Sequence, residues 1–170
     1  MRNIKFSFND KEDRQTYNTY NNIDVKMDNE SYSIFSINGG GNCCLISDSG
    51  IEIFFDLESK RVGGLGGYLG SINNFKPSNI SLSTANQEGI IYVDNNDEFI
   101  PGVAYSFSFN DDILYDKANK ILLFGSYNEQ LPTYKFLKNA YAQIDNGGSL
   151  SAILVTDISL DFEKSKSMGD

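Results

Sequence analysis

Residues 134–160, YKFLKNAYAQIDNGGSLSAILVTDISL, form the stretch of sequence that decides the fold. The Asp-Asn-Gly-Gly at residues 145–148 lies between two segments rich in apolar side chains. Asn-Gly between such segments is the strongest short-range signal for a β-hairpin. We therefore expect residues 134–144 and 149–160 to be the two arms of a hairpin.

The second arm also predicts which side chains share a face. Leu150, Ala152 and Leu154 are two residues apart, so in a regular strand they lie on one face, and Ile153 lies on the other. In the first arm the apolar spacing over residues 137–144 also admits a short helix.

Short apolar or alternating segments recur through the rest of the chain and are separated by Gly, Pro, Asn, Asp and Ser. Many short strands with turn signals about every ten residues are typical of a sandwich or barrel. We expect a mainly antiparallel all-β fold, either a β-sandwich or an open, barrel-like two-sheet domain, with at most one or two short helices. The expected strands are residues 2–8, 32–37, 42–47, 51–55, 61–71, 78–83, 89–93, 102–109, 111–116 and 120–125.

The whole chain, residues 1–170, is expected to be a single domain. Residues 9–31 are polar and Asn-rich without a clear period, which predicts a long loop with room for one helical turn at residues 11–17. Residues 162–170 are charged and are expected to fray.

Composition limits the function classes. The chain has no His and no Trp, and its 23 acidic against 14 basic residues give a net charge of −9. Nucleic acid and anionic membranes would be repelled, whereas a basic protein would be attracted. No stretch approaches the roughly 20 apolar residues that span a bilayer, and the N-terminus has no apolar signal region. We therefore expect a soluble, cytoplasmic protein.

Cys43 and Cys44 are adjacent, which is incompatible with ordinary disulfide geometry. Two reduced thiols, at least one of them buried, are expected. Thiol catalysis would need a histidine base and a structural zinc site would need four Cys or His ligands, so neither is expected.

Two glycine clusters lack the context of a phosphate-binding loop. Gly64, Gly66 and Gly67 run into a Tyr-Leu-Gly-Ser segment with no Lys and no helix. A bent or bulged strand is the better interpretation. Residues 39–41 precede a strand and predict a flexible turn.

Clustered carboxylates offer two further possibilities. The Asp-Asn-Asn-Asp-Glu at residues 94–98 departs from a calcium loop because Ile100 and Pro101 interrupt it, so a solvated turn is expected. Glu52 and Asp56 are the best pair for glycoside hydrolysis and would share a face if both were in one strand. No acid lies in an obviously apolar setting that would raise its pKa. We expect no enzyme activity, no cofactor and no metal.

Residues 51–158 contain two spaced strand-turn motifs. One has the form Asp-x5-Val-x4-Gly and the other the form Tyr-Asp-x5-Leu-x2-Gly, at Asp56, Val62 and Gly67 and at Tyr115, Asp116, Leu122 and Gly125. This stretch resembles immunity proteins of contact-dependent growth inhibition and other polymorphic toxin systems of bacteria.

The resemblance implies a cytoplasmic, non-catalytic protein that binds and neutralises a cognate toxin, often a basic nuclease. An acidic surface would steer such an encounter. On charge and expected exposure, the candidate contact residues are Tyr92, Asp94, Asp97, Glu98, Asp111, Asp112 and Tyr115. The alternative is a carbohydrate-binding β-sandwich module, in which Tyr and Phe stack on sugar rings and Asn and Asp bind hydroxyls. A hydrolase using Glu52 and Asp56 is the third hypothesis.

Overall fold

The computed structural model describes residues 3–10, 21–37, 40–95, 98–109 and 112–160. The predicted hairpin is confirmed: β14 (Ala140–Ile144) pairs antiparallel with β15 (Leu150–Val155). Its turn is closed by the Asp145 N–H, which donates to the Ser149 carbonyl at 2.9 Å. The Asp145 carboxylate accepts from the N–H groups of Gly147 and Ser149, both at 2.8 Å.

The predicted first arm is wrong in one respect, because residues 134–144 form two strands. β13 (Thr133–Leu137) and β14 pair antiparallel around a turn at Lys138 and Asn139. The buried Asn139 side chain forms hydrogen bonds there that a continuous strand could not accommodate.

These strands belong to a seven-stranded sheet in the order β7-β11-β12-β15-β14-β13-β8. The central strands pair antiparallel, whereas the short edge strands β7 and β8 each pair parallel with their neighbour. The remaining members are β7 (Lys76–Pro77), β8 (Asn86–Glu88), β11 (Ile113–Asp116) and β12 (Ile121–Gly125).

The second sheet has six strands in the order β10-β4-β5-β6-β3-β2. Its pairs are antiparallel except β10 with β4. Its members are β2 (Ile23–Asp28), β3 (Ser31–Ser36), β4 (Cys43–Ile46), β5 (Ile51–Phe55), β6 (Val62–Ser71) and β10 (Ala104–Ser106). β1 (Phe6–Asn9) and β9 (Ile90–Val93) form a separate antiparallel pair, and η2 (Ile72–Asn74) is a 3₁₀ turn.

Two predicted segments are corrected. The expected loop of residues 9–31 contains β2, whose charged outward residues hide its strand pattern. The expected strand at residues 78–83 is an extended strap outside both sheets, although its Ile80 is buried. The helical turn expected at residues 11–17 and the tail expected to fray at residues 162–170 lie outside the described residues.

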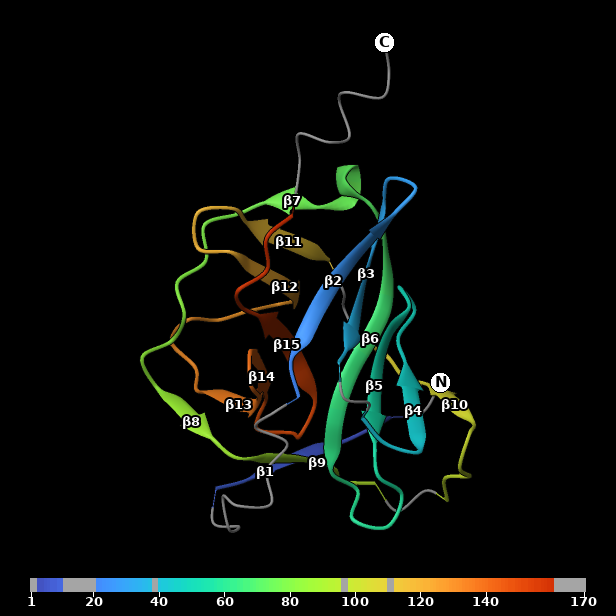
Figure 1. Ribbon diagram of the computed structural model, residues 1–170. Coiled ribbons are helices and arrows are strands. Elements are labelled where there is room, and N and C mark those ends of the chain that lie inside the picture. The colour runs from blue at the N-terminus through green and yellow to red at the C-terminus, as the bar shows by residue number, and fades with distance from the viewer. Residues whose placement is uncertain (1–2, 11–20, 38–39, 96–97, 110–111, 161–170) are drawn as a thin grey trace.

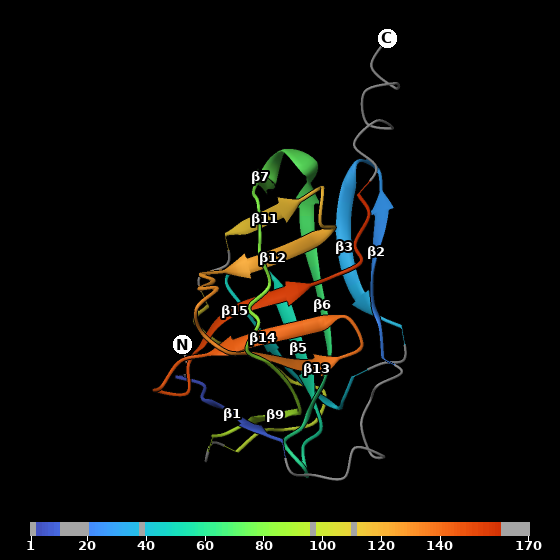
Figure 2. The ribbon, with the colours of Figure 1, turned by 90° about the vertical axis from the view of Figure 1, so that its left-hand side faces the viewer.

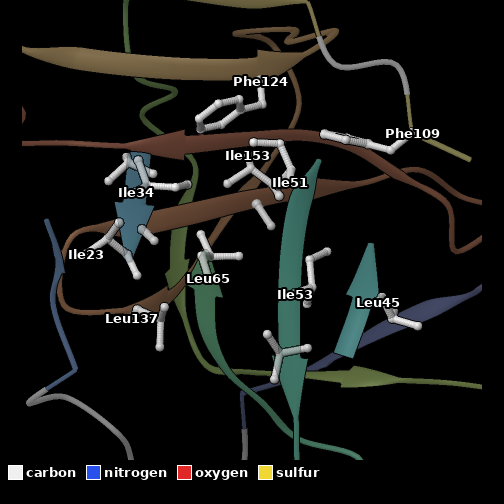
Figure 3. Packing of buried hydrophobic residues seen from close by; sticks show 14 of the residues in the cluster. Ile23, Ile34, Leu45, Ile51, Ile53, Leu65, Phe109, Phe124, Leu137 and Ile153 are labelled. Atoms are coloured by element: carbon white, nitrogen blue, oxygen red, sulfur yellow. The ribbon is translucent and has the colours of Figure 1, made fainter. Parts of the chain in front are cut away.

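The two sheets pack face to face as a β-sandwich-like fold, and their strands cross steeply (Figures 1 and 2). The side chains of Ile53, Leu65 and Ile153 meet in the core between them (Figure 3). Phe6 and Val93 of the β1–β9 pair belong to the same core, so this pair lies against one end of the sandwich. Within the described residues, no helix has the length and apolarity to cross a membrane.

Both faces of the seven-stranded sheet are covered. Ile153 and Val155 face the six-stranded sheet, whereas Ala152 and Leu154 pack on the other side with Ile80 of the strap. Leu150 packs against the inner core rather than beside Ala152, because a bulge between them shifts the alternation. The face predicted for Leu150 is therefore wrong.

Asn139 joins the two sheets through its side-chain amide. Its Oδ1 accepts from the N–H of Ile23 on β2 at 2.8 Å, and its Nδ2 donates to the Ile23 carbonyl at 2.9 Å. The same Nδ2 donates to the carbonyl of Thr156, after β15, at 2.9 Å. A buried amide satisfied on both sides fixes where β2 lies against the other sheet.

Candidate functional site

The predicted acidic contact residues that the structure describes do not form one cluster. Asp94 and Glu98 are exposed on the segment that follows β9. Asp112 is exposed immediately before β11, and its Oδ1 lies 2.7 Å from the Lys76 Nζ. β9 and β11 occupy opposite ends of the molecule in both views (Figures 1 and 2). Asp97 and Asp111 lie outside the described residues.

The two predicted contact tyrosines differ in exposure. Tyr92 is half-buried in β9. Tyr115 is only 4% exposed, and its hydroxyl donates to the Ile158 carbonyl at 3.0 Å and accepts from the Leu160 N–H. The expectation that Tyr115 is exposed is therefore wrong, because its position in β11 directs the ring into the core.

The outer face of the six-stranded sheet carries a different set of residues. Strand register places Glu52 of β5 and Phe35 of β3 on either side of Gly66 of β6. Phe35 is 41% exposed and Tyr68 is 63% exposed. Glu52 and Phe54 are half-buried and alternate with core residues of β5, so they point outward. We call Phe35, Glu52, Phe54, Gly66 and Tyr68 the open face.

The centre of this face carries glycine on β6, and the ends of the Glu52 and Phe54 side chains lie over Gly66. A Cβ on Gly66 would lie 2.9 Å from Glu52 Oε2 and 2.9 Å from Phe54 Cε2. The space that a side chain would fill is thus occupied by the ends of two neighbouring side chains. The glycine cluster is part of a bulged strand, as predicted, and carries no phosphate-loop geometry.

The two thiols are reduced, as expected, with Cys43 buried and Cys44 half-buried. Burial raises the pKa of Cys44 to about 11, and the negative charge of Glu52 contributes. Burial also raises the pKa of Cys43. Since the thiolate is the nucleophilic form, neither thiol is activated.

Glu52 and Asp56 do not share a strand face, because β5 ends at Phe55. The Asp56 carboxylate accepts from the backbone N–H and the hydroxyl of Ser59, at 2.8 and 2.7 Å. These bonds lower the pKa of Asp56. A general acid needs the opposite shift, so the geometry gives the hydrolase hypothesis no support.

A groove of about 610 Å³ lies on the opposite side of the molecule, over the outer face of the seven-stranded sheet. Leu114 of β11 and Leu123 of β12 line it together with the strap at residues 78–81 and the loop at residues 127–130. Glu129 is the one charged residue among those that line it, and the others are amides, hydroxyls and apolar groups.

Hydrogen bonds from polar side chains, of which Asp116 and Gln143 are buried, hold both walls of this groove. The Asp116 carboxylate accepts from the Ile80 N–H at 2.7 Å and from Asn119. The Tyr127 hydroxyl donates to the Ser81 carbonyl at 3.0 Å. On the other wall, the Gln143 side chain bonds the backbone N–H and carbonyl of Asn128. The groove is therefore fixed in shape before any ligand arrives.

Among the described residues, no three Cys, Asp or Glu side chains converge in a way that could hold a metal ion. Comparison with models of known protein families finds no match to this chain. None of the curated proteins is significantly similar to it. Function must therefore be inferred from the geometry of the chain.

The open face escaped prediction as a binding surface. The alternation of Glu52 and Phe54 in IEIFF predicts that both point the same way. What the sequence does not show is the register that sets them beside Gly66 and Phe35.

The hydrogen bonds that the Asp116 carboxylate accepts from Ile80 and Asn119 predict a specific dependence of stability on pH. Hydrogen bonds from the N–H groups of Ile80 and Asn119 lower the pKa of Asp116 below its ordinary value of 3.8. Its contribution is therefore complete above pH 3.8 and is lost as the pH falls through the lower folded-state value. Asp116→Asn should cost about 2 kcal/mol of unfolding free energy at pH 7, because charge-assisted bonds are lost.

Urea denaturation of both proteins between pH 7 and pH 2.5 provides the measurement. The difference between wild type and Asp116→Asn should shrink below pH 3.8, whereas the exposed Asp48→Asn control should differ little from wild type throughout. A difference in unfolding free energy between wild type and Asp116→Asn that stays constant with pH would contradict this role of the Asp116 carboxylate.

Proposed function

We propose that this chain is a non-catalytic binding protein that receives a basic protein partner on its open face. The observation that carries the proposal is the row of Glu52, Gly66 and Phe35, flanked by Phe54, on a sheet face that faces outward. Exposed aromatic side chains on a sheet surface are typical binding anchors. A neighbouring carboxylate selects a positively charged partner.

The predicted acids support this role at longer range. Asp94 and Glu98 follow β9 whereas Asp112 precedes β11, so the three acids do not make one contact patch. Together with the net charge of −9, they create a field that attracts a basic partner from several directions. The open face would then provide the binding affinity, and the loop acids would raise the association rate.

We propose further that the partner is a cognate bacterial toxin and that the chain acts as its immunity protein in the cytoplasm. The resemblance of residues 51–158 to immunity proteins of polymorphic toxin systems supports this, and so does the acidity of the chain. A basic nuclease-type toxin has the complementary charge.

A rescue assay tests the immunity function. The C-terminal region of the protein encoded immediately upstream is expressed with and without this chain, and surviving cells are counted. Killing that this chain relieves is the expected result. Killing without relief, or no killing, would contradict the immunity function.

Charge reversal tests the steering. Asp94, Glu98 and Asp112 are replaced together by Lys, and association with the toxin domain is followed by stopped flow from low to physiological salt. We expect association about tenfold slower at low salt and a flatter salt dependence, because the long-range attraction is weakened. The variant in which the same three acids are replaced by Asn, Gln and Asn should associate at a rate between those of the wild type and the Lys variant. If the association rate and its salt dependence were unchanged in the Lys variant, these acids would not steer association.

The groove favours a second candidate function, carbohydrate binding. A fixed groove lined by Asn79, Asn128, Gln130 and the Tyr127 ring offers hydroxyl partners and little charge. A volume of about 610 Å³ is ordinary for a small-ligand site. On a glycan array, binding that Asn128→Leu weakens would support this function, and an array without binding would eliminate it.

A further inference from the structure

The strap at residues 78–83 lies across the outer face of the seven-stranded sheet. Figure 2 shows it running from β7, at one edge of the sheet, toward β8 at the other. Its side chains alternate, because Ile80 is buried against the sheet whereas Asn79 and Ser81 are exposed. The backbone N–H and C=O groups of such an extended segment point sideways, and they change side from one residue to the next. The strap therefore has two lateral edges.

One edge of the strap faces β11 and the turn that follows it. The Ser78 N–H donates to the Tyr115 carbonyl at 3.1 Å. The Ile80 N–H donates to the Asp116 carboxylate at 2.7 Å, and the Ile80 carbonyl accepts from Asn119 Nδ2 at 3.4 Å. Hydrogen bonds within the chain thus occupy the backbone groups that residues 78 and 80 turn to this side.

The other edge of the strap faces the groove of about 610 Å³. The Ser81 carbonyl accepts from the hydroxyl of Tyr127, which lies on the loop that forms the opposite wall. By the alternation of an extended segment, the N–H and C=O of Asn79 and the N–H of Ser81 turn to the same side. In the part of the chain that the structure describes, these three groups have no hydrogen-bond partner. One wall of the groove therefore offers backbone donors and acceptors at the spacing of a strand.

The free groups on this edge suit a parallel neighbour. In parallel pairing, one residue of an incoming strand would donate its N–H to the Asn79 carbonyl and accept from the Ser81 N–H. Antiparallel pairing would also need the Ser81 carbonyl, which already accepts from Tyr127. Short parallel pairs occur at both edges of the same sheet, between β7 and β11 and between β8 and β13.

The floor of the groove suits an apolar side chain. The residue of the incoming strand that pairs beside Ile80 points its side chain toward the sheet, as Ile80 does. There the groove is lined by Leu114 of β11 and Leu123 of β12, which are register partners and lie side by side. The residues on either side of it point away from the sheet, and Glu129 on the opposite wall attracts a basic side chain at these positions.

We propose that this groove binds an extended segment of a second protein partner. The segment pairs parallel with the strap at Asn79 and Ser81 and places an apolar side chain, flanked by basic ones, on Leu114 and Leu123. Strand addition of this kind takes affinity from the backbone and specificity from alternate side chains. A sugar does not carry a donor and an acceptor at strand spacing, so the free backbone edge favours a peptide. The site lies on the opposite side from the open face, and the inference goes beyond the proposed function.

A short peptide tests the site without any knowledge of the partner. Acetyl-Val-Lys-Leu-Lys-Val-amide is titrated into the full chain, labelled with ¹⁵N and in its leucine methyl groups, and shifts are followed by NMR. We expect saturable shifts at the Ser81 amide and at the methyl groups of Leu114 and Leu123. The same peptide with an N-methyl group on its leucine cannot donate to the Asn79 carbonyl and should bind about tenfold more weakly. Equal binding of the two peptides, or shifts with neither, would overturn the proposal.

A proline in the strap tests the backbone edge from the side of the chain. Ser81→Pro removes the N–H that parallel pairing uses and keeps the carbonyl that Tyr127 holds, so we expect binding of the peptide about tenfold weaker. Thr84→Pro is the matched control, because its N–H also makes no hydrogen bond within the described chain and it lies outside the groove. The melting temperature of each variant reports whether it is folded. Unchanged peptide affinity in folded Ser81→Pro would overturn the pairing.

A charge change tests the preference for basic side chains. Glu129→Gln should weaken peptide binding about threefold, whereas Glu58→Gln, an equal change on the exposed β5–β6 turn, should leave it nearly unchanged. Equal effects of the two would overturn the role of Glu129.

Cellotriose, a neutral trisaccharide, is titrated in the same way as the competing ligand. No shifts at the Ser81 amide or the Leu114 methyl groups is the expected result. Saturable shifts there with cellotriose, and none with the peptide, would assign the groove to carbohydrate and overturn the proposal.

Discussion

Leu154 and Val155 point to opposite faces of β15, and both are fully buried. The rest of the structure depends on this double burial, because a sheet covered on one side by another sheet needs a separate cover on the other. The strap at residues 78–83 supplies it, with Ile80 packed beside Leu154. Since the strap is not a strand, its backbone needs other partners, which Asp116, Asn119 and Tyr127 provide. These bonds also shape the groove.

The six-stranded sheet is built on the opposite principle. Its inner side chains enter the shared core, whereas its outer face carries Phe35, Phe54 and Tyr68. At the centre of β6 this face carries glycine, and the ends of the Glu52 and Phe54 side chains lie over Gly66. Aromatic groups that contribute nothing to the core, grouped around one carboxylate, are readily explained by a partner. The contrast between a covered face and an open one is the basis of the functional proposal.

Much of the fold was predictable from local chemistry. The Asp-Asn-Gly-Gly turn, the alternation in IEIFF and the spacing of turn residues were sufficient for an all-β two-sheet fold. The errors arose where tertiary contacts override local pattern. β2 looks like a loop because Asp24, Lys26 and Asp28 face outward, and its position depends on the Asn139 amide. The strap looks like a strand because Ile80 and Leu82 alternate with serine.

The site was harder to predict for the same reason. Exposure of a loop acid can be inferred from composition, but Tyr115 was misplaced because only the packing of β11 decides which way its ring points. Glu52 and the β6 glycines were each visible in the sequence. Their meeting depends on a register with bulges on both sides of β6, which no local pattern specifies.

Hydroxyl-radical footprinting of the chain with and without the proposed toxin partner tests the central claim most directly. The account predicts that Phe35 and Tyr68, both exposed in the free chain, become protected from oxidation in the complex. Leu131 and Tyr127, on the side of the groove, should be oxidised equally in both states. Protection of Leu131 and Tyr127 with Phe35 and Tyr68 unchanged would contradict the account and move the binding surface to the opposite side of the molecule.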